Sequence, residues 1–148
     1  ELSQYKIRHT VVTDNAGGLL MKEGLVDFVI VGADRVALDG QVCNKIGTYL
    51  KAIAAKENKI PFYVAAPIST IDINFSGKSR NFEIECRDSD EIMTMKGQDK
   101  SGSIVEVRLG NSPAYNPAFD VTPPEYVSKF ICEKGVFDAD KIRDIVDL

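Results

Sequence analysis

The chain has 148 residues, 44% of them hydrophobic, and a formal net charge of −4. This composition is typical of one folded domain with a sizeable core, and it excludes a disordered chain. The acidic balance argues against sequence-independent binding to nucleic acid, which needs clustered Lys and Arg, but it leaves small anionic ligands open.

The first predicted elements are a strand and a helix, followed by a second strand. β-Branched residues predict a strand over 7–12, and Thr13 with Asp14 is suited to cap a helix that runs through Met21. Residues 26–31, VDFVIV, are nearly all apolar. Such a run is typical of a parallel strand that is covered on both faces.

A crossover unit is predicted next. After a loop to Cys43, apolar side chains at three- and four-residue steps predict a helix from Asn44 to about Asn58. The apolar stretch PFYVAAP, residues 61–67, predicts another strand. Strand, helix and strand form a right-handed βαβ unit, so we expect an α/β fold that is Rossmann-like, with a mostly parallel sheet and helices on both faces.

The second half of the chain is less regular. The stretch KGQDKSGS, residues 96–103, predicts an exposed loop, and a short strand over 104–107 follows it. Thr122 and Glu125 match a capping box with two prolines between them, which predicts a helix that continues to the glycine at 135. A final short helix is predicted over 139–146, with an aspartate before it as the cap.

Cysteine usage and hydropathy indicate where the protein is found. Cys43, Cys86 and Cys132 are odd in number and have no CxxC spacing, so neither a disulfide framework nor a zinc site is predicted. No apolar run approaches the roughly 20 residues that span a bilayer, and no signal peptide opens the sequence. We therefore expect reduced thiols, a cytoplasmic location and no membrane partner.

Asp34 is the first candidate for chemistry. The tetrapeptide GADR follows the apolar run 26–31, and ligands of open parallel sheets collect at the carboxyl ends of strands. Loops that cover Asp34 would remove it partly from water and suit it to acid–base work. A structural alternative stays open at this point, in which Asp34 pairs with Arg35 or caps a turn.

Asn44 and Lys45 are the next candidates. They open the predicted helix, where free backbone N–H groups and the positive end of the helix dipole favour a phosphate, and Lys45 would add a full charge. In the alternative interpretation, Asn44 is an ordinary N-cap and Lys45 is a solvated residue of the first turn.

Three stretches carry a resemblance to a known family. They are TDNAGGLLM at 13–21, GADRVALDGQVCNKIGTYLKAIAAKENKIPFYVAAPISTID at 32–72, and NPAFDVTP at 116–123. Together they resemble the methylthioribose-1-phosphate isomerases of methionine salvage. NKIGT is shared with a wider superfamily, which includes ribose-1,5-bisphosphate isomerases and the regulatory subunits of the translation initiation guanine-nucleotide exchange factor.

The resemblance implies an enzyme that converts 5-methylthioribose 1-phosphate into 5-methylthioribulose 1-phosphate, an aldose–ketose isomerisation without a redox cofactor or a metal. It implies that Asp34 is the catalytic acid/base and that Asn44 and Lys45 contact the phosphosugar. It also implies a homodimer formed through this domain.

Residues 1–148 are then expected to be the carboxyl-terminal catalytic domain of a longer protein. The family's second catalytic group is a cysteine in a Thr-x-Cys-Asn loop, and neither that loop nor the family's substrate-binding arginine segments occurs in these residues. The first residue, Glu1, also suggests that the sequence begins inside a longer chain. The amino-terminal domain is thus expected to be absent from it.

Two local departures motivate other functions. The sequence reads Asp39-Gly40-Gln41 where the family usually reads NGD, and Cys86 stands where the family has a glutamate. A non-catalytic regulatory or sugar-phosphate-sensing protein is one alternative. A ribose-1,5-bisphosphate isomerase is another, which is disfavoured because the segment AAPISTID lacks the cations that a second phosphate needs.

Overall fold

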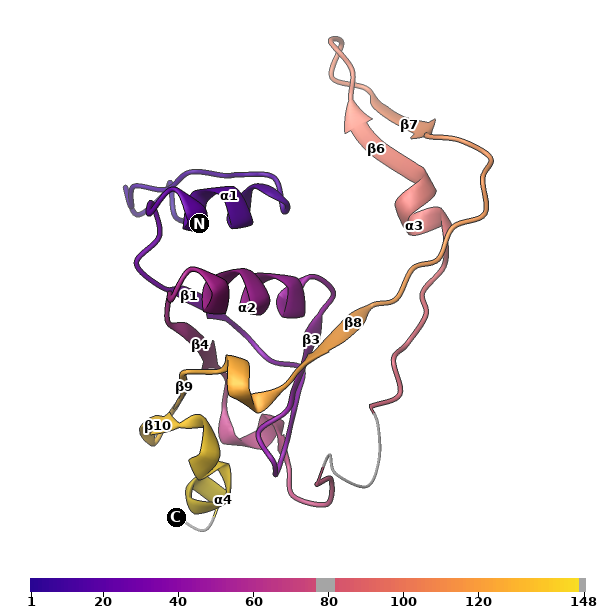
Figure 1. Ribbon diagram of the computed structural model, residues 1–148. Coiled ribbons are helices and arrows are strands. Elements are labelled where there is room, and N and C mark those ends of the chain that lie inside the picture. Colours follow the sequence, from indigo (N-terminus) through magenta and orange to yellow (C-terminus); the bar gives the residue numbers. More distant parts are fainter. Residues whose placement is uncertain (77–81, 147–148) are drawn as a thin grey trace.

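The computed structural model describes residues 1–76 and 82–146. In this part of the chain, the strands form two four-stranded sheets and a separate two-stranded hairpin (Figure 1). Parallel and antiparallel pairs both occur, so the fold is mixed α/β rather than a single mostly parallel sheet.

The first sheet contains the predicted crossover unit. Its strand order is β1 (Val29–Val31), β4 (Phe62–Ala65), β9 (Lys129–Cys132) and β10 (Gly135–Asp138). The first three strands are parallel, and β10 runs antiparallel to β9. Helix α2 (Thr48–Glu57) connects β1 to β4 through the crossover, which confirms the βαβ prediction.

The main core lies between α2 and this sheet. Helix α2 buries Thr48, Ala52 and Ala55, and the two alanines allow the helix to approach the strands closely. Helix α1 (Ala16–Lys22) lies against the outer side of α2 and buries Met21 (Figure 1). The buried residues of this core are Met21, Val36, Val42, Ala52, Ala55, Phe62, Val64, Val127, Phe130, Ile142 and Ile145.

The second sheet carries the residues that matter for function. Its strand order is β5 (Ile71–Asp72), β2 (Arg35–Ala37), β3 (Val42–Lys45) and β8 (Phe119–Thr122). Strands β2 and β3 form a hairpin in the stretch that the sequence predicted to be a loop. At its tip, Gly40 has a φ of 87°, and a Cβ there would lie 2.9 Å from the Ala139 carbonyl oxygen, so only glycine fits.

Two predictions for the first 31 residues are wrong. Residues 7–12 form no strand and are exposed, because no neighbouring strand pairs with them in the described chain. Strand β1 is an edge strand with one exposed face, where Ile30 is 53% exposed, so it is not covered on both faces. The predicted helix is confirmed as α1, but its N-cap is Asn15, which makes no capping hydrogen bond with its side chain.

The helix predicted from the capping-box pair is also wrong. Thr122 is buried at the end of β8, and the two prolines lead into a single 3₁₀ turn, η2 (Pro124–Tyr126). The following residues form β9, because Phe130 and Ile131 pair with β4 and Phe130 enters the core. Pairing with a distant strand has overridden a local helix signal.

The carboxyl-terminal helix is confirmed. It comprises a 3₁₀ turn, η3 (Ala139–Lys141), that continues into α4 (Ile142–Val146). The predicted cap Asp138 instead accepts a hydrogen bond from the Lys129 ammonium at 2.6 Å. Throughout residues 1–76 and 82–146, no helix has the length and apolar character needed to cross a membrane.

A hairpin projects away from the two sheets (Figure 1). Short helix α3 (Asp90–Met93) leads into β6 (Thr94–Gln98), which pairs antiparallel with β7 (Ile104–Arg108). The strand predicted over 104–107 is confirmed. The predicted loop over 96–103 is wrong in its first half, because it contributes three residues to β6 and only the turn at 99–103 is irregular.

Candidate functional site

Asp34 lies where the two sheets meet. It follows the carboxyl end of β1 and precedes β2, and its backbone N–H donates to the Cys43 carbonyl oxygen at 3.0 Å. Arg35 pairs with Cys43 across β2 and β3, so the next position of the hairpin sets Asp34 opposite Asn44. The carboxylate of Asp34 is exposed and accepts no hydrogen bond from the described residues, so the expected cover by loops is not observed.

Arg35 is paired with Asp72 and not with Asp34. Both Nε and Nη2 of Arg35 donate to one Asp72 oxygen, at 2.9 Å for Nε. The guanidinium also lies over the rings of Phe75 and Phe82, 4.9 and 5.7 Å from their centres. The alternative that Asp34 is an ion-pair partner of Arg35 is therefore wrong, and the Asp34 carboxylate remains open to a ligand.

The Arg35–Asp72 pair connects β2 to a pocket wall. Hydrogen bonds from Arg35, and then from the Asn74 backbone N–H, hold the pKa of the Asp72 carboxyl below its usual range. The pair crosses between β2 and β5, which are parallel neighbours in the sheet. A pocket opens beside it, lined by Asp34, Arg35, Ser69, Thr70, Ile71, Asp72, Ile73 and Asn74.

Asn44 and Lys45 lie on a strand and not on a helix. They are the last two residues of β3, and α2 begins three residues later at Thr48, with Gly47 as its N-cap. The prediction that Asn44 and Lys45 open the helix is therefore wrong in its local geometry. The structure nevertheless brings Asn44 next to Asp34, with Lys45 exposed at the end of the same strand.

A carboxylate occupies the amino-terminal end of α2. The side chain of Asp120, on β8, accepts hydrogen bonds from the backbone N–H groups of Gly47 at 2.7 Å and Tyr49 at 3.1 Å. The negative charge complements the helix dipole, and the two N–H groups are satisfied. They are consequently not available for a phosphate, so Lys45 would have to bind an anion through its side chain.

A second set of hydrogen bonds orders the turn between β3 and α2. The hydroxyl of the buried Thr48 donates to the Lys45 carbonyl oxygen at 2.7 Å and accepts from the Asn44 side-chain amide at 2.9 Å. Gly47 has a φ of 97°, a conformation that side chains with a Cβ rarely adopt. Asn44 and Lys45 thus end in a turn that is held at both sides.

Cys43 lies under this site as an unreactive thiol. Burial is the largest cause that raises its pKa, and the charge of Asp34 adds to it. The side chain is only 6% exposed. Because the thiolate is the reactive form of cysteine, Cys43 is not arranged as a nucleophile.

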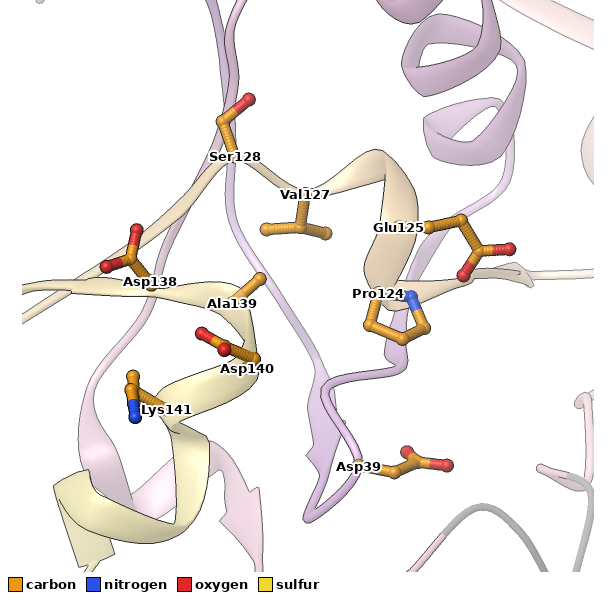
Figure 2. Close-up of a pocket in the computed structure, with 9 residues that line it drawn as sticks. All are labelled: Asp39, Pro124, Glu125, Val127, Ser128, Asp138, Ala139, Asp140 and Lys141. Carbon is orange, nitrogen blue, oxygen red and sulfur yellow. The ribbon is translucent and has the colours of Figure 1, made fainter.

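Another pocket lies on a different part of the molecule, between η2 and the start of η3 (Figure 2). It shares no lining residue with the pocket at Asp34. Four of its residues are carboxylates, Asp39, Glu125, Asp138 and Asp140, and Lys141 is the one cation among them. This sign of charge disfavours a phosphosugar. In residues 1–76 and 82–146, no group of three or more His, Cys, Asp or Glu side chains is arranged to hold a metal ion.

The two departures from the family pattern have structural roles away from Asp34. Asp39 accepts hydrogen bonds from the backbone and side-chain nitrogens of Gln41, which closes the tip of the β2–β3 hairpin. Cys86 is exposed and bridges to Pro117 through its backbone. Its neighbour Arg87 pairs with Glu91 at 2.8 Å.

Sequence reasoning missed three residues that organise the site. Asp120, Thr48 and Asp72 each lie in a motif that was noted, NPAFDVTP, NKIGT or STID, but none was given a role. Their partners are Gly47 and Tyr49, Asn44, and Arg35. Two of these contacts join residues that are far apart in the chain, so spacing alone offers no signal for them.

Comparison with known proteins gives consistent relatives. The model of the initiation factor 2 subunit family matches residues 1–139. Proteins named methylthioribose-1-phosphate isomerase from Methylocella silvestris and Gluconobacter oxydans are each 52% identical over 141 residues. The match covers 94% of this chain but 38% of each relative, so the chain spans about two-fifths of their length.

Solved structures of two differently named proteins share the fold. One is 5-methylthioribose 1-phosphate isomerase from Pyrococcus horikoshii, at a TM-score of 0.81 and 38% identity. The other is translation initiation factor eIF-2B subunit delta from A. fulgidus, at a TM-score of 0.83 and 38% identity. Each match covers 99% of this chain, and 39% and 41% of those chains. The fold is thus common to an enzyme and to a translation factor.

Proposed function

The chain belongs to the initiation factor 2 subunit family, and we propose that its full-length protein isomerises 5-methylthioribose 1-phosphate to 5-methylthioribulose 1-phosphate. The observation that carries the proposal is the meeting of Asp34, Asn44 and Lys45 at one end of the β2–β3 hairpin. The 52% identity to proteins named as this isomerase supports the choice of reaction.

In the proposed mechanism, Asp34 is the acid/base. The phosphate on C1 masks the aldehyde, so the furanose ring opens before hydrogen moves between C1 and C2. An exposed carboxylate without a partner can accept and return a proton, as this step requires. Lys45 would neutralise the phosphate through its ammonium group. The second catalytic group, a cysteine, belongs to the part of the relatives that these residues do not match, with residues 1–148 as the carboxyl-terminal catalytic domain.

The pocket next to Asp34 supports a methylthio sugar over a bisphosphate. Ser69, Thr70, Ile71 and Ile73 give it hydroxyl and apolar walls. Its one cation, Arg35, is already neutralised by Asp72. A second phosphate would meet no free positive charge among these residues.

Turnover by the full-length protein tests the proposal. We expect conversion of 5-methylthioribose 1-phosphate, and ribose 1,5-bisphosphate should be the poorer substrate. A higher kcat/KM on the bisphosphate would reassign the substrate. Absence of turnover on either sugar would refute the proposed activity.

A non-catalytic sugar-phosphate sensor is the second candidate. It is favoured by the equal 38% identity to an enzyme structure and to an initiation factor structure, because the fold does not separate the two functions. Binding of 5-methylthioribose 1-phosphate without turnover would support this candidate over the isomerase.

A homodimer is part of the proposal. The register of β6 and β7 directs Met95, Val105 and Val107 to one face of the hairpin, and these side chains are 61%, 38% and 54% exposed. Tyr115 nearby in the chain is 78% exposed. We expect a dimeric mass for the full-length protein, and a monomeric mass well above micromolar concentration would contradict it.

Two broader expectations accompany this proposal. A Rossmann-like arrangement with helices on both faces would require the exposed Ile30 side of the first sheet to be covered in the full-length protein. A cytoplasmic location is supported by the free thiols of Cys43, Cys86 and Cys132.

A further inference from the structure

The orientation of the Asn44 amide follows from the hydrogen bonds around it. A threonine hydroxyl has one hydrogen, and the hydroxyl of Thr48 donates it to the Lys45 carbonyl oxygen, which can only accept. The same hydroxyl must therefore accept from Asn44, and only the nitrogen of that amide can donate. The Asn44 amide oxygen is thereby directed away from Thr48.

That oxygen is open to a ligand. It accepts no hydrogen bond from the described residues, and the one buried side-chain atom without a partner there is the Thr122 hydroxyl, so the Asn44 oxygen reaches solvent. A carbonyl oxygen accepts hydrogen bonds and does not donate them. Phosphate oxygens are also acceptors, so this side of Asn44 suits a hydroxyl group of a ligand and not a phosphate.

We propose that Thr48 is a positioning residue that orients Asn44 so that its amide oxygen accepts a hydrogen bond from the 2-hydroxyl of the bound sugar phosphate. The inference rests on the proposed function, which supplies the sugar. The 2-hydroxyl is chosen because Asn44 lies opposite Asp34 in the β2–β3 hairpin. Asp34 acts at C1 and C2, and the 2-hydroxyl is bonded to C2.

The arrangement divides the tasks of two neighbouring residues. Asn44 would read the sugar ring, and Lys45 would bind the phosphate, because successive side chains of a strand point to opposite faces and the Lys45 ammonium is the free cation of the pair. Thr48 is only 5% exposed and would not touch the ligand itself. Its effect on binding would pass through Asn44.

The test is a comparison of two sugars on matched variants of the full-length protein. Calorimetry would measure binding of 5-methylthioribose 1-phosphate and of its 2-deoxy counterpart in an Asp34→Asn background, which slows consumption of the sugar. We expect the 2-hydroxyl to strengthen binding about three- to tenfold, the usual contribution of one neutral hydrogen bond. With Thr48→Val, which keeps the shape and removes the hydroxyl, this ratio should fall below about twofold.

Two further variants keep the inference falsifiable if Thr48→Val does not fold. Thr48→Ser retains the hydroxyl and should retain the sugar ratio, whereas Asn44→Ala should lose it. An unchanged ratio in Asn44→Ala or in folded Thr48→Val would overturn the inference.

Inorganic phosphate serves as the second probe. Its affinity should stay within about twofold in Asn44→Ala, since the expected contact is to the sugar and a lost hydrogen bond would exceed this change. Loss of phosphate affinity with an intact sugar ratio would assign Asn44 to the phosphate and overturn the inference. If wild-type protein turns over the substrate but the two sugars bind equally, the inference alone fails. If neither sugar binds, the proposed function fails with it.

Discussion

The molecule contains two antiparallel hairpins with opposite surroundings. The β2–β3 hairpin lies between β5 and β8 and buries Val36, Ala37, Val42 and Cys43. The β6–β7 hairpin has no third strand, and all its residues except Thr94 are exposed. The same local structure is thus part of the core in one place and a projecting arm in the other (Figure 1).

The difference has a functional consequence. The β2–β3 hairpin has neighbours on both sides, so the residues at its end are held firmly enough to position a substrate. An isolated two-stranded hairpin is marginally stable in water. The β6–β7 hairpin, whose apolar face is uncovered in the described chain, is therefore better suited to contact another surface than to hold a catalytic group.

The largest expected effect belongs to the first hairpin. Asp34→Asn keeps the shape of the side chain and removes the ionisable group, so kcat of the full-length protein should fall by about 10²- to 10⁴-fold. Binding of the sugar should change little. Steady-state kinetics with calorimetry would measure both quantities.

Circular dichroism and thermal unfolding of this variant provide the control. If Asp34→Asn unfolds the domain, or if it leaves turnover intact, Asp34 is structural and the two hairpins do not differ in the way we propose.

Two exposed lysines at the hairpins form a matched pair for the next test. Lys45→Ala should raise KM more than it lowers kcat, by the equivalent of about 1.5–3 kcal/mol, because a charge-assisted contact to phosphate is lost in the ground and transition states alike. Lys96→Ala removes the same charge from β6 and should leave both constants unchanged. Equal effects of the two variants would show general charge attraction in place of a specific contact.

Features encoded by neighbouring residues were predictable from the sequence. The β1–α2–β4 unit follows from apolar periodicity within one stretch, and Asp34 was noted because it follows an apolar strand. Asn44 and Lys45 were identified by their motif, although the predicted helix start was wrong, since pairing of β3 with β8 extends the strand to Lys45.

Features that depend on distant partners were not predictable. Asp120 caps a helix that begins more than 70 residues earlier, and no local pattern indicates that contact. The stretch after Thr122 has good local helix signals, yet the free edge of β4 gives it a better partner as strand β9. The β2–β3 hairpin was missed because its strands are only three and four residues long.

Asp120 provides a test of how firmly the first hairpin is held. Asp120→Ala leaves the N–H groups of Gly47 and Tyr49 without their acceptor, so the free energy of unfolding should fall by about 1–2 kcal/mol, as for other lost helix caps. Asp120→Asn retains one acceptor and should lose less. Urea unfolding would measure both variants, and no loss in Asp120→Ala would mean that water replaces the carboxylate.

The smallest expected effect is a change in acid sensitivity. Arg35 lowers the pKa of Asp72 in the folded protein, so the ionised carboxyl stabilises the fold above its unfolded pKa, and this contribution is lost as the pH falls through the lower, folded value. Asp72→Asn should therefore be less stable than wild type at neutral pH and should approach it as the pH falls below about 4, the unfolded pKa. Urea unfolding between about pH 2 and pH 6 would measure this convergence. Glu106→Gln is the matched control, because it breaks the Lys96–Glu106 pair of the other hairpin, whose partners are 72% and 55% exposed. Such exposed pairs contribute little to stability, so its profile should follow wild type, and convergence of both variants would mean that the two hairpins are anchored alike.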